Sequence, residues 1–280
     1  MLLRKKEEVE AWLNQYLIKN YELIPNEKYG YIVNVYGSVN LFNNNLESID
    51  VKFNEIKENF LCNNNCLISL KGCPEIINGD FWCNNNKLKN LEYSPKIVKG
   101  YFDCSNKQLE SLKGCPDKLD YLDCHNNNLT SLKSDLKEVY GLNCNFNQLI
   151  SLEGCPQIIN DDFLCNYNNL TSLEGCPKII NGCFECSYNQ LISLKGCPEI
   201  ISKHFYCMNN LLKIKELKYL LKIKECGYIY LKNNKELGKL QDVSNFNQLK
   251  EKINIYFEKE DLLNIINKEN LSINKIIKKI

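Results

Sequence analysis

The chain carries a repeat of 20 or 21 residues, and this repeat constrains its fold more than any other feature. In each copy a phenylalanine or leucine precedes a marker cysteine by two residues, and a leucine follows it by five. In all copies but the last, further apolar residues follow at eight and fifteen residues. Chance does not keep such columns in phase over eight copies. The marker cysteines are Cys62, Cys83, Cys104, Cys124, Cys144, Cys165, Cys186 and Cys207.

These columns predict a stack of coils, each with one short strand. Residues two apart on a strand point to the same side, so the aromatic and cysteine columns face inward together. One coil cannot bury that side alone, whereas stacked coils bury a continuous core. Cysteine then acts as a small apolar residue. We expect reduced thiols and no metal, because parallel columns supply neither disulfide geometry nor converging ligands.

Less regular copies extend the repeat at both ends. An earlier copy begins at Val39 and places Leu41 in the cysteine column. A degenerate last copy uses Ile229 and Leu231, with Asn234 three residues later. The repeat therefore predicts about nine or ten coils over residues 39–240.

The segments outside the repeat have different patterns, and a solenoid needs covers over its open ends. Residues 4–18 have the periodicity of an amphipathic helix, and residues 21–40 alternate like strands around a turn. We expect residues 1–38 to form an N-terminal cap of one helix and strands. Helical periodicity begins at Asn245, so residues 241–280 are expected to form a helical C-terminal cap or a small helical module.

The repeat unit reads F-x-C-x-x-N-x-L-x-S-L-x-G-C-P-x-x-I, and it resembles the leucine-rich repeat L-x-x-L-x-L-x-x-N-x-L. It is more closely similar to a bacterial and bacteriophage subgroup with repeats of the form G-x-F-x-C-x-x-N-x-L-T-S-L-x-G-x-P. The resemblance implies a right-handed leucine-rich repeat solenoid with short parallel strands on its concave face. It also implies that the asparagine column satisfies backbone groups where each strand turns. The pattern is clearest in Leu119, Leu122, Cys124, Asn127 and Leu129.

Charge is distributed unevenly along the chain. Residues 39–210 carry a net charge of −5 and residues 211–280 a net charge of +6, although the whole chain is near neutral. The basic region 211–280 supports one alternative function, which is nucleic-acid binding through that region.

The strand positions that should face outward are those three before, one before and one after the marker cysteine. Over eight coils they include five acidic residues and no lysine or arginine. Acidic and aromatic side chains together suit a basic, partly apolar protein partner and repel phosphates. The candidate partner-binding residues are Asp80, Trp82, Tyr101, Asp103, Tyr121, Asp123, His125, Asp162, Glu185, His204 and Tyr206.

Chemistry at this face is the less favoured interpretation. Cys183, His204 and Glu185 should be neighbours, which allows a thiol dyad or a partial zinc site. The sequence supplies too few ligands for closed zinc and no feature that would stabilise an oxyanion. No motif for phosphate binding, serine hydrolysis or zinc proteolysis is present. We therefore expect no catalysis, cofactor or metal.

The sequence thus predicts a non-catalytic protein-interaction module. No apolar run approaches the roughly 20 residues that span a bilayer, and the first residues lack the order of a secretory signal. We expect a cytoplasmic protein, or one in the host cytoplasm if it is phage-encoded. The resemblance to phage-borne repeats adds the expectation that it inhibits a host defence or nucleic-acid-handling protein.

Overall fold

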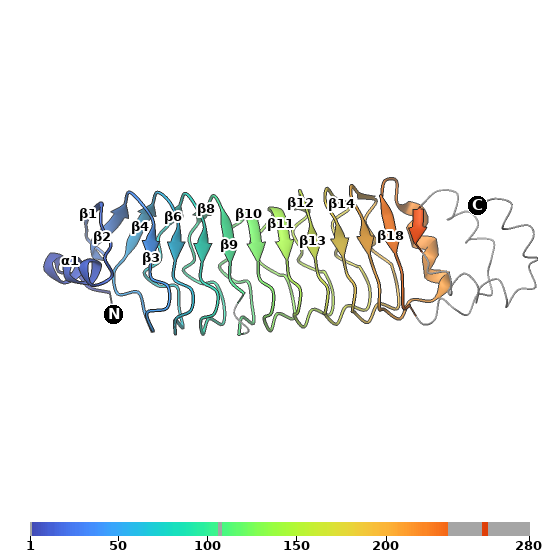
Figure 1. Cartoon of the computed structure of the whole chain (residues 1–280), viewed down its shortest axis with the longest axis horizontal. Helices are drawn as coiled ribbons and strands as arrows, with labels where there is room; N and C mark the ends of the chain where they lie inside the picture. Colours follow the sequence, from blue (N-terminus) through green and yellow to red (C-terminus); the bar gives the residue numbers. More distant parts are fainter. Residues whose placement is uncertain (1, 106–107, 235–253, 257–280) are drawn as a thin grey trace, which may run out of the picture.

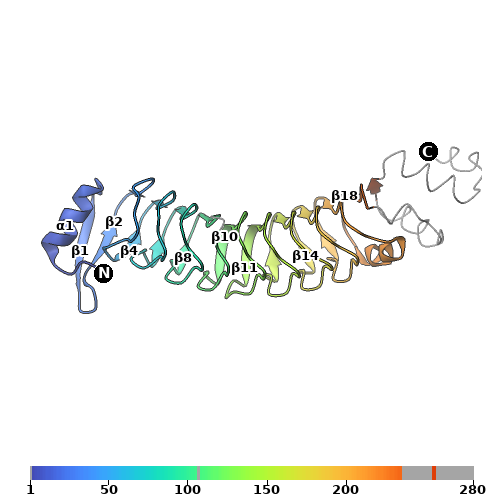
Figure 2. The same ribbon diagram turned by 90° about the horizontal axis from the view of Figure 1, so that it is seen from below.

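The computed structural model describes residues 2–105, 108–234 and 254–256, which form a parallel β-solenoid of about nine turns (Figure 1). This number lies within the range that the repeat predicts. Two perpendicular views show an elongated stack with little curvature, in which α1 (Lys6–Gln15) lies at one end and β18 (Tyr228–Tyr230) at the other (Figure 2). The strands therefore line a long, nearly straight face.

The segment before the first coil contains the predicted helix and strands. Helix α1 buries Val9, Trp12 and Leu13, and the Trp12 ring centroid lies 6.1 Å from that of Phe53 in the first coil. Strands β1 (Tyr21–Asn26) and β2 (Gly30–Val35) form an antiparallel hairpin. Strand β2 then pairs in parallel with β4 (Phe53–Ile56), which joins the hairpin to the solenoid.

Two ladders of strands run along the stack. The smaller sheet has the order β1-β2-β4-β6-β8, with β6 at Ile76–Ile77 and β8 at Ile97–Val98. The larger, 14-stranded sheet follows the marker cysteines. Its main ladder consists of β3 (Val39–Asn40), β5 (Phe60–Leu61), β7 (Phe81–Trp82), β9 (Tyr101–Asp103), β10 (Lys118–Asp123), β11 (Glu138–Asn143), β13 (Phe163–Leu164), β15 (Phe184–Glu185), β17 (Phe205–Tyr206), β18 and β19 (Asn254–Tyr256).

Coil length decides how the two ladders connect. In coils of 21 residues a bend separates the strand at the isoleucine column from the strand at the phenylalanine column. In the two coils of 20 residues one residue is missing there, and β10 and β11 each run through both positions. Beyond β11 the ladders separate again. The side branch consists of β12 (Ile158–Ile159), β14 (Ile179–Ile180) and β16 (Ile200–Ile201).

The inward columns form the core as predicted. All eight marker cysteines have no exposed surface, and the phenylalanine column is equally buried. Parallel pairing sets like residues side by side, so that the Phe184 and Phe205 ring centroids lie 5.2 Å apart. Burial raises the pKa of the Cys104 and Cys144 thiols well above the ordinary value, which keeps them protonated.

The asparagine column satisfies backbone groups inside the turns, as the resemblance implies. Asn147 donates from Nδ2 to the carbonyl oxygens of Cys124 and Cys144, at 3.0 and 3.1 Å. Its Oδ1 accepts the backbone N–H of Leu129 at 3.0 Å. One side chain thus ties two consecutive coils together, and the same pattern recurs along the stack.

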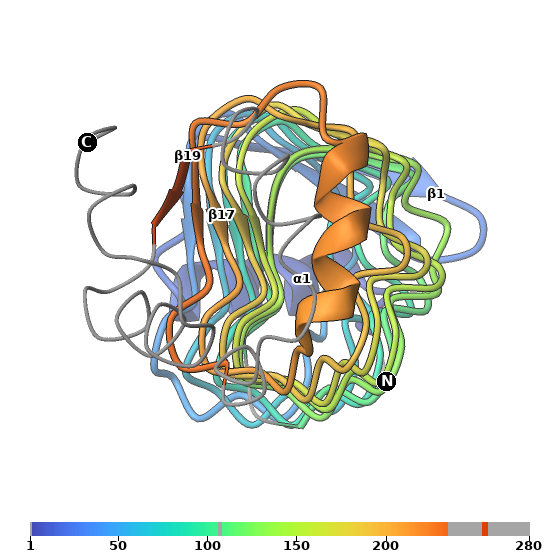
Figure 3. The same cartoon turned by 90° about the vertical axis from the view of Figure 1, so that its right-hand side faces the viewer.

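The C-terminal part agrees with the sequence in one place and differs in another. The degenerate last coil is confirmed, because β18 pairs with β17 and buries Ile229 and Leu231. The 3₁₀ helix η1 (Ile214–Lys222) precedes it and lies across the coil from β17 (Figure 3). Helical periodicity predicts helix from Asn245 onward, yet β19 is a strand. The remainder of 241–280 lies outside the described residues.

Candidate functional site

The outward side chains of the main ladder, at the three positions around each marker cysteine, form a surface that we call the strand face. All eleven candidate residues come from this ladder or the residues beside it. They fall into two groups, because the coil that contains β11 places Gly141, Asn143 and Asn145 between them. The first group lies around β7, β9 and β10. The second lies around β13, β15 and β17.

A stacked pair of tyrosines is the centre of the first group. Parallel pairing places Tyr121 beside Tyr101, and their rings lie 4.7 Å apart at an angle of 13°. The next position along the ladder is Gly141, where an added Cβ would come within 2.5 Å of Cε2 of Tyr121. Because Gly141 has no side chain, the Tyr121 ring can lie directly over it.

A hydrogen-bond network lies beneath this pair. The Tyr101 hydroxyl donates to Oδ2 of Asp123 at 2.5 Å, while Nδ1 of His125 lies 2.6 Å from Oδ1 of Asp123. Asp123 is only 7% exposed, so the expectation that its side chain is exposed is wrong. Its carboxylate lies under Tyr101 and positions the ring of that residue through the hydrogen bond. Burial, and then the bond to Asp123, raise the pKa of the Tyr101 hydroxyl above its ordinary value.

The neighbouring Asp103 is less buried than Asp123. It pairs in register with Asp123, is half-buried, and accepts a hydrogen bond of 2.6 Å from the Ser105 hydroxyl. Burial raises the pKa of Asp103, although the Ser105 bonds favour the ionised form. Within residues 2–105 and 108–234, no lysine or arginine nitrogen lies within 4.0 Å of a carboxylate oxygen of Asp80, Asp103 or Asp123. Among the described residues, the carboxylates of Asp80 and Asp103 therefore have no lysine or arginine partner, and Asp123 has only His125 beside it.

The second group is more aromatic than predicted. The Tyr206 and Tyr230 rings stack at 4.6 Å and 4°, and the Tyr228 ring lies 5.5 Å from His204. Sequence reasoning missed Tyr228 and Tyr230, although they lie three and one residues before Leu231 in the last coil.

A lysine at the corner of the coil compensates part of this group's charge. Lys203 lies 2.8 Å from Asp161 and 3.3 Å from Asp162. Glu185 accepts a hydrogen bond of 2.7 Å from Asn166. Lys203 is outside the three outward columns, so the column count did not include it. Among the described residues, the first group consequently has more carboxylates without a lysine or arginine partner than the second.

The arrangement of Cys183 and His204 does not favour thiol chemistry. Nδ1 of His204 accepts the backbone N–H of Tyr228 at 3.2 Å. Burial raises the pKa of Cys183, which lowers its thiolate fraction. In the described part of the chain, no group of three or more His, Cys, Asp and Glu side chains could hold a metal ion.

A third set of aromatic residues, also missed, borders the strand face at the turns. Phe146, Tyr167 and Tyr188 follow their marker cysteines by two residues and have φ of 54° each. Asparagine, which tolerates this left-handed conformation, occupies the same position in other coils. The rings stack at 4.4 and 4.3 Å and are exposed. Bulky residues in a strained conformation with exposed rings are a signal of function.

No family model, curated protein or solved structure matches the chain. Among the described residues, no helix has both the length and the apolar character needed to cross a bilayer.

Proposed function

We propose that this chain is a non-catalytic interaction module whose strand face binds a basic partner protein. One observation carries the proposal: the Tyr101–Tyr121 stack lies beside Asp80 and Asp103, whose carboxylates have no lysine or arginine partner among the described residues. Rigid aromatic side chains contribute contact area at low entropic cost, and unpaired carboxylates attract lysine and arginine. A guanidinium group can contact both a carboxylate and an aromatic face, which makes arginine the best-fitting anchor.

We further propose that the solenoid is a right-handed leucine-rich repeat capped at both ends. Support comes from the asparagine bonds in the turns and from α1, whose buried face packs against the first coil. Residues 241–280, which include the strand β19, would supply the cap at the other end. The resemblance to phage-borne repeats leads us to propose a host defence or nucleic-acid-handling protein as the partner, met in the host cytoplasm.

The test compares capture of partners by matched variants of the full chain. Asp80→Asn/Asp103→Asn removes two charges from the strand face, and Asp117→Asn/Glu153→Gln removes two exposed charges elsewhere. We expect the first pair to weaken capture about tenfold or more, since central anchors dominate binding energy. The control pair should leave capture intact. A partner held equally by both variants would overturn the proposal.

Nucleic-acid binding through residues 211–280 remains the alternative function. One described feature favours it, because Lys218 and Lys222 place their ammonium groups 5.1 and 5.8 Å from the Tyr219 ring centroid. Phosphate contacts predict that affinity falls steeply with salt concentration. A gel shift that persists in Asp80→Asn/Asp103→Asn and disappears in Lys218→Gln/Lys222→Gln would favour this alternative.

A further inference from the structure

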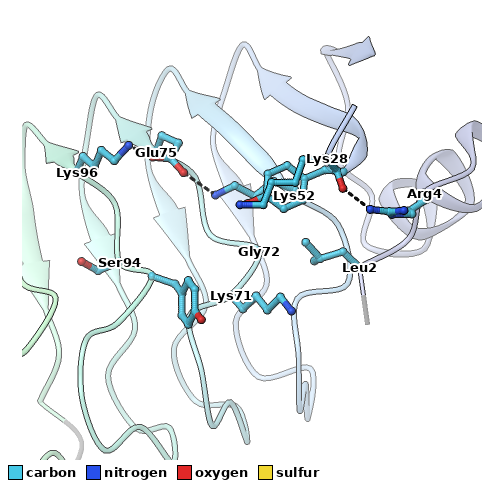
Figure 4. Close-up of a pocket in the computed structure, with 11 residues that line it drawn as sticks. Leu2, Arg4, Lys28, Lys52, Lys71, Gly72, Glu75, Ser94 and Lys96 are labelled. Atoms are coloured by element: carbon cyan, nitrogen blue, oxygen red, sulfur yellow. Dashed lines mark hydrogen bonds and ion pairs between the residues drawn. The ribbon is translucent and has the colours of Figure 1, made fainter. Parts of the chain in front are cut away.

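A basic groove lies at the N-terminal end of the solenoid, outside the strand face. It has a volume of about 820 Å³, and it lies between the tip of the β1–β2 hairpin and the turns of the first coils (Figure 4). Five of its lining residues are cationic and one is acidic. The charged residues are Arg4, Lys28, Lys52, Lys71, Lys96 and Glu75.

Among the described residues, two of the five cations have a carboxylate partner. Glu75 lies between Lys52 and Lys96, at 3.0 and 2.9 Å, and Lys52 also donates to the Cys73 carbonyl oxygen at 2.6 Å. For Arg4, Lys28 and Lys71, no carboxylate of the described chain lies within 4.0 Å of the side-chain nitrogens. The groove therefore has an excess of positive charge that an anion can neutralise.

The walls of the groove are held in place before any ligand arrives. Oδ1 of Asn26 accepts the backbone N–H groups of Lys28 and Tyr29, each at 3.0 Å, which fixes the hairpin tip. The Arg4 guanidinium donates to the Lys28 carbonyl oxygen and ties the N-terminal segment to that tip. The Lys28 ammonium lies 4.9 Å from the Tyr29 ring centroid. The backbone of the hairpin tip therefore needs little ordering when a ligand binds, which favours affinity.

Tyr93 is the residue in the groove that packing does not explain. It occupies the repeat position that Gly72 and Gly114 fill in the neighbouring coils, with φ of 103° and 90°. Tyr93 adopts φ of 67° there and leaves its side chain 64% exposed. A left-handed conformation costs an ordinary residue about 1–2 kcal/mol, and burial does not repay it here. An exposed tyrosine that replaces glycine beside unpaired cations indicates a ligand with a flat apolar part.

We propose that this groove binds a nucleoside phosphate, either free or within single-stranded nucleic acid. Arg4, Lys28 and Lys71 would hold the phosphate oxygens, and the base would stack on Tyr93. Cationic side chains around phosphate and an aromatic ring under a base are the two recurring parts of such sites. A bare anion would use the cations and leave Tyr93 without a role. This site is independent of partner binding at the strand face.

The test measures binding of three probes to the full chain at low salt: ATP, a ten-nucleotide oligo-dT and inorganic tripolyphosphate. Tyr93→Gly restores the glycine of the repeat and should weaken ATP or oligo-dT roughly fivefold or more while leaving tripolyphosphate unchanged. Lys28→Gln/Lys71→Gln should weaken all three probes. Lys133→Gln/Lys137→Gln, an exposed pair on other coils, is the charge-matched control. A preference for ATP identifies the free nucleotide as the source, and a preference for oligo-dT identifies the strand.

Three outcomes would overturn the proposal: no binding of ATP or oligo-dT by the unmodified chain, an equal effect of both lysine pairs, or an unchanged preference for ATP over tripolyphosphate in Tyr93→Gly. Tighter binding of an oligoglutamate peptide than of either nucleotide probe would show that the groove takes acidic peptide instead. Asp80→Asn/Asp103→Asn should leave nucleotide binding intact, so failure here and failure of the strand-face proposal are distinguishable.

Discussion

Replacing Asn168 by alanine should destabilise the solenoid through one backbone group in particular. Asn168 is 6% exposed and donates from Nδ2 to the carbonyl oxygens of Cys144, Cys165 and Asn166, at 3.0, 3.2 and 3.2 Å. Its Oδ1 accepts the backbone N–H of Leu149 at 3.0 Å. The side chain thus satisfies four backbone groups at once.

The loss of the Asn168 side chain affects these four backbone groups unequally. The three carbonyl oxygens each keep a second donor, namely Asn147 Nδ2, Asn189 Nδ2 and the backbone N–H of Phe146. The Leu149 N–H has no other partner in the described structure, and Leu149 is fully buried. An unpaired buried donor costs about 1–3 kcal/mol, and each weakened carbonyl adds less than one ordinary hydrogen bond. We therefore expect a loss of about 2–4 kcal/mol in the free energy of unfolding.

Urea unfolding followed by circular dichroism measures this loss, with Asn181→Ala as the matched control. Asn181 is exposed, and its Nδ2 makes only a 3.5 Å contact with Asn160. The control should stay within about 0.5 kcal/mol of the unmodified chain. Hydrogen exchange should accelerate first in β11 and β13, because each coil contacts only its neighbours. Equal unfolding energies for the two variants would refute the view that the asparagine column supports the turns.

Three further predictions concern single side chains. Gly141→Ala should tilt the Tyr121 ring off Tyr101, because the new Cβ would lie 2.5 Å from Cε2 of Tyr121. The near-ultraviolet circular dichroism of tyrosine should then fall, and an unchanged spectrum would contradict the stacking. Asp103→Asn should raise stability at pH 7, since a raised pKa in the folded state means that stability falls as the pH rises through it. That gain should vanish in urea titrations below the usual carboxyl range, and a gain independent of pH would rule out the charge as its cause. Tyr93→Gly should raise the unfolding free energy by about 1 kcal/mol as the left-handed strain is removed, and a lower thermal midpoint would show that Tyr93 packs favourably.

The repeat columns predicted the core and the marker strands because an inward position requires an apolar residue in every coil. The second ladder was not predicted. Its isoleucines alternate between exposed Ile158 and buried Ile159, and two residues are too few for a strand pattern to emerge from sequence. The two ladders merge at β10 and β11 because each of these coils is one residue shorter than the others. The shorter spacing can be read from the sequence, but its effect can be interpreted only when the second ladder is known.

The repeat columns predicted which positions belong to the candidate site. They could not predict contacts made by side chains that bend away from their own column. The Asp123 carboxylate lies under Tyr101 and accepts a hydrogen bond from its hydroxyl. A list of outward positions cannot show this contact. Lys203 reaches two carboxylates from the coil corner. Tyr228 and Tyr230 obey the same spacing as the predicted residues and were findable, had the degenerate coil been counted with the others.

The parallel register of the main ladder sets a fixed interval on its surface. Successive members of one column repeat at roughly 4.8 Å, whereas the turns of an α-helix repeat at about 5.4 Å. A helix lying along the stack would fall out of step by about 0.6 Å per coil and be half an interval out after about four coils. A helical partner could therefore match either aromatic group of the strand face in register, but not both. Only a partner built from stacked strands shares the interval along the whole length.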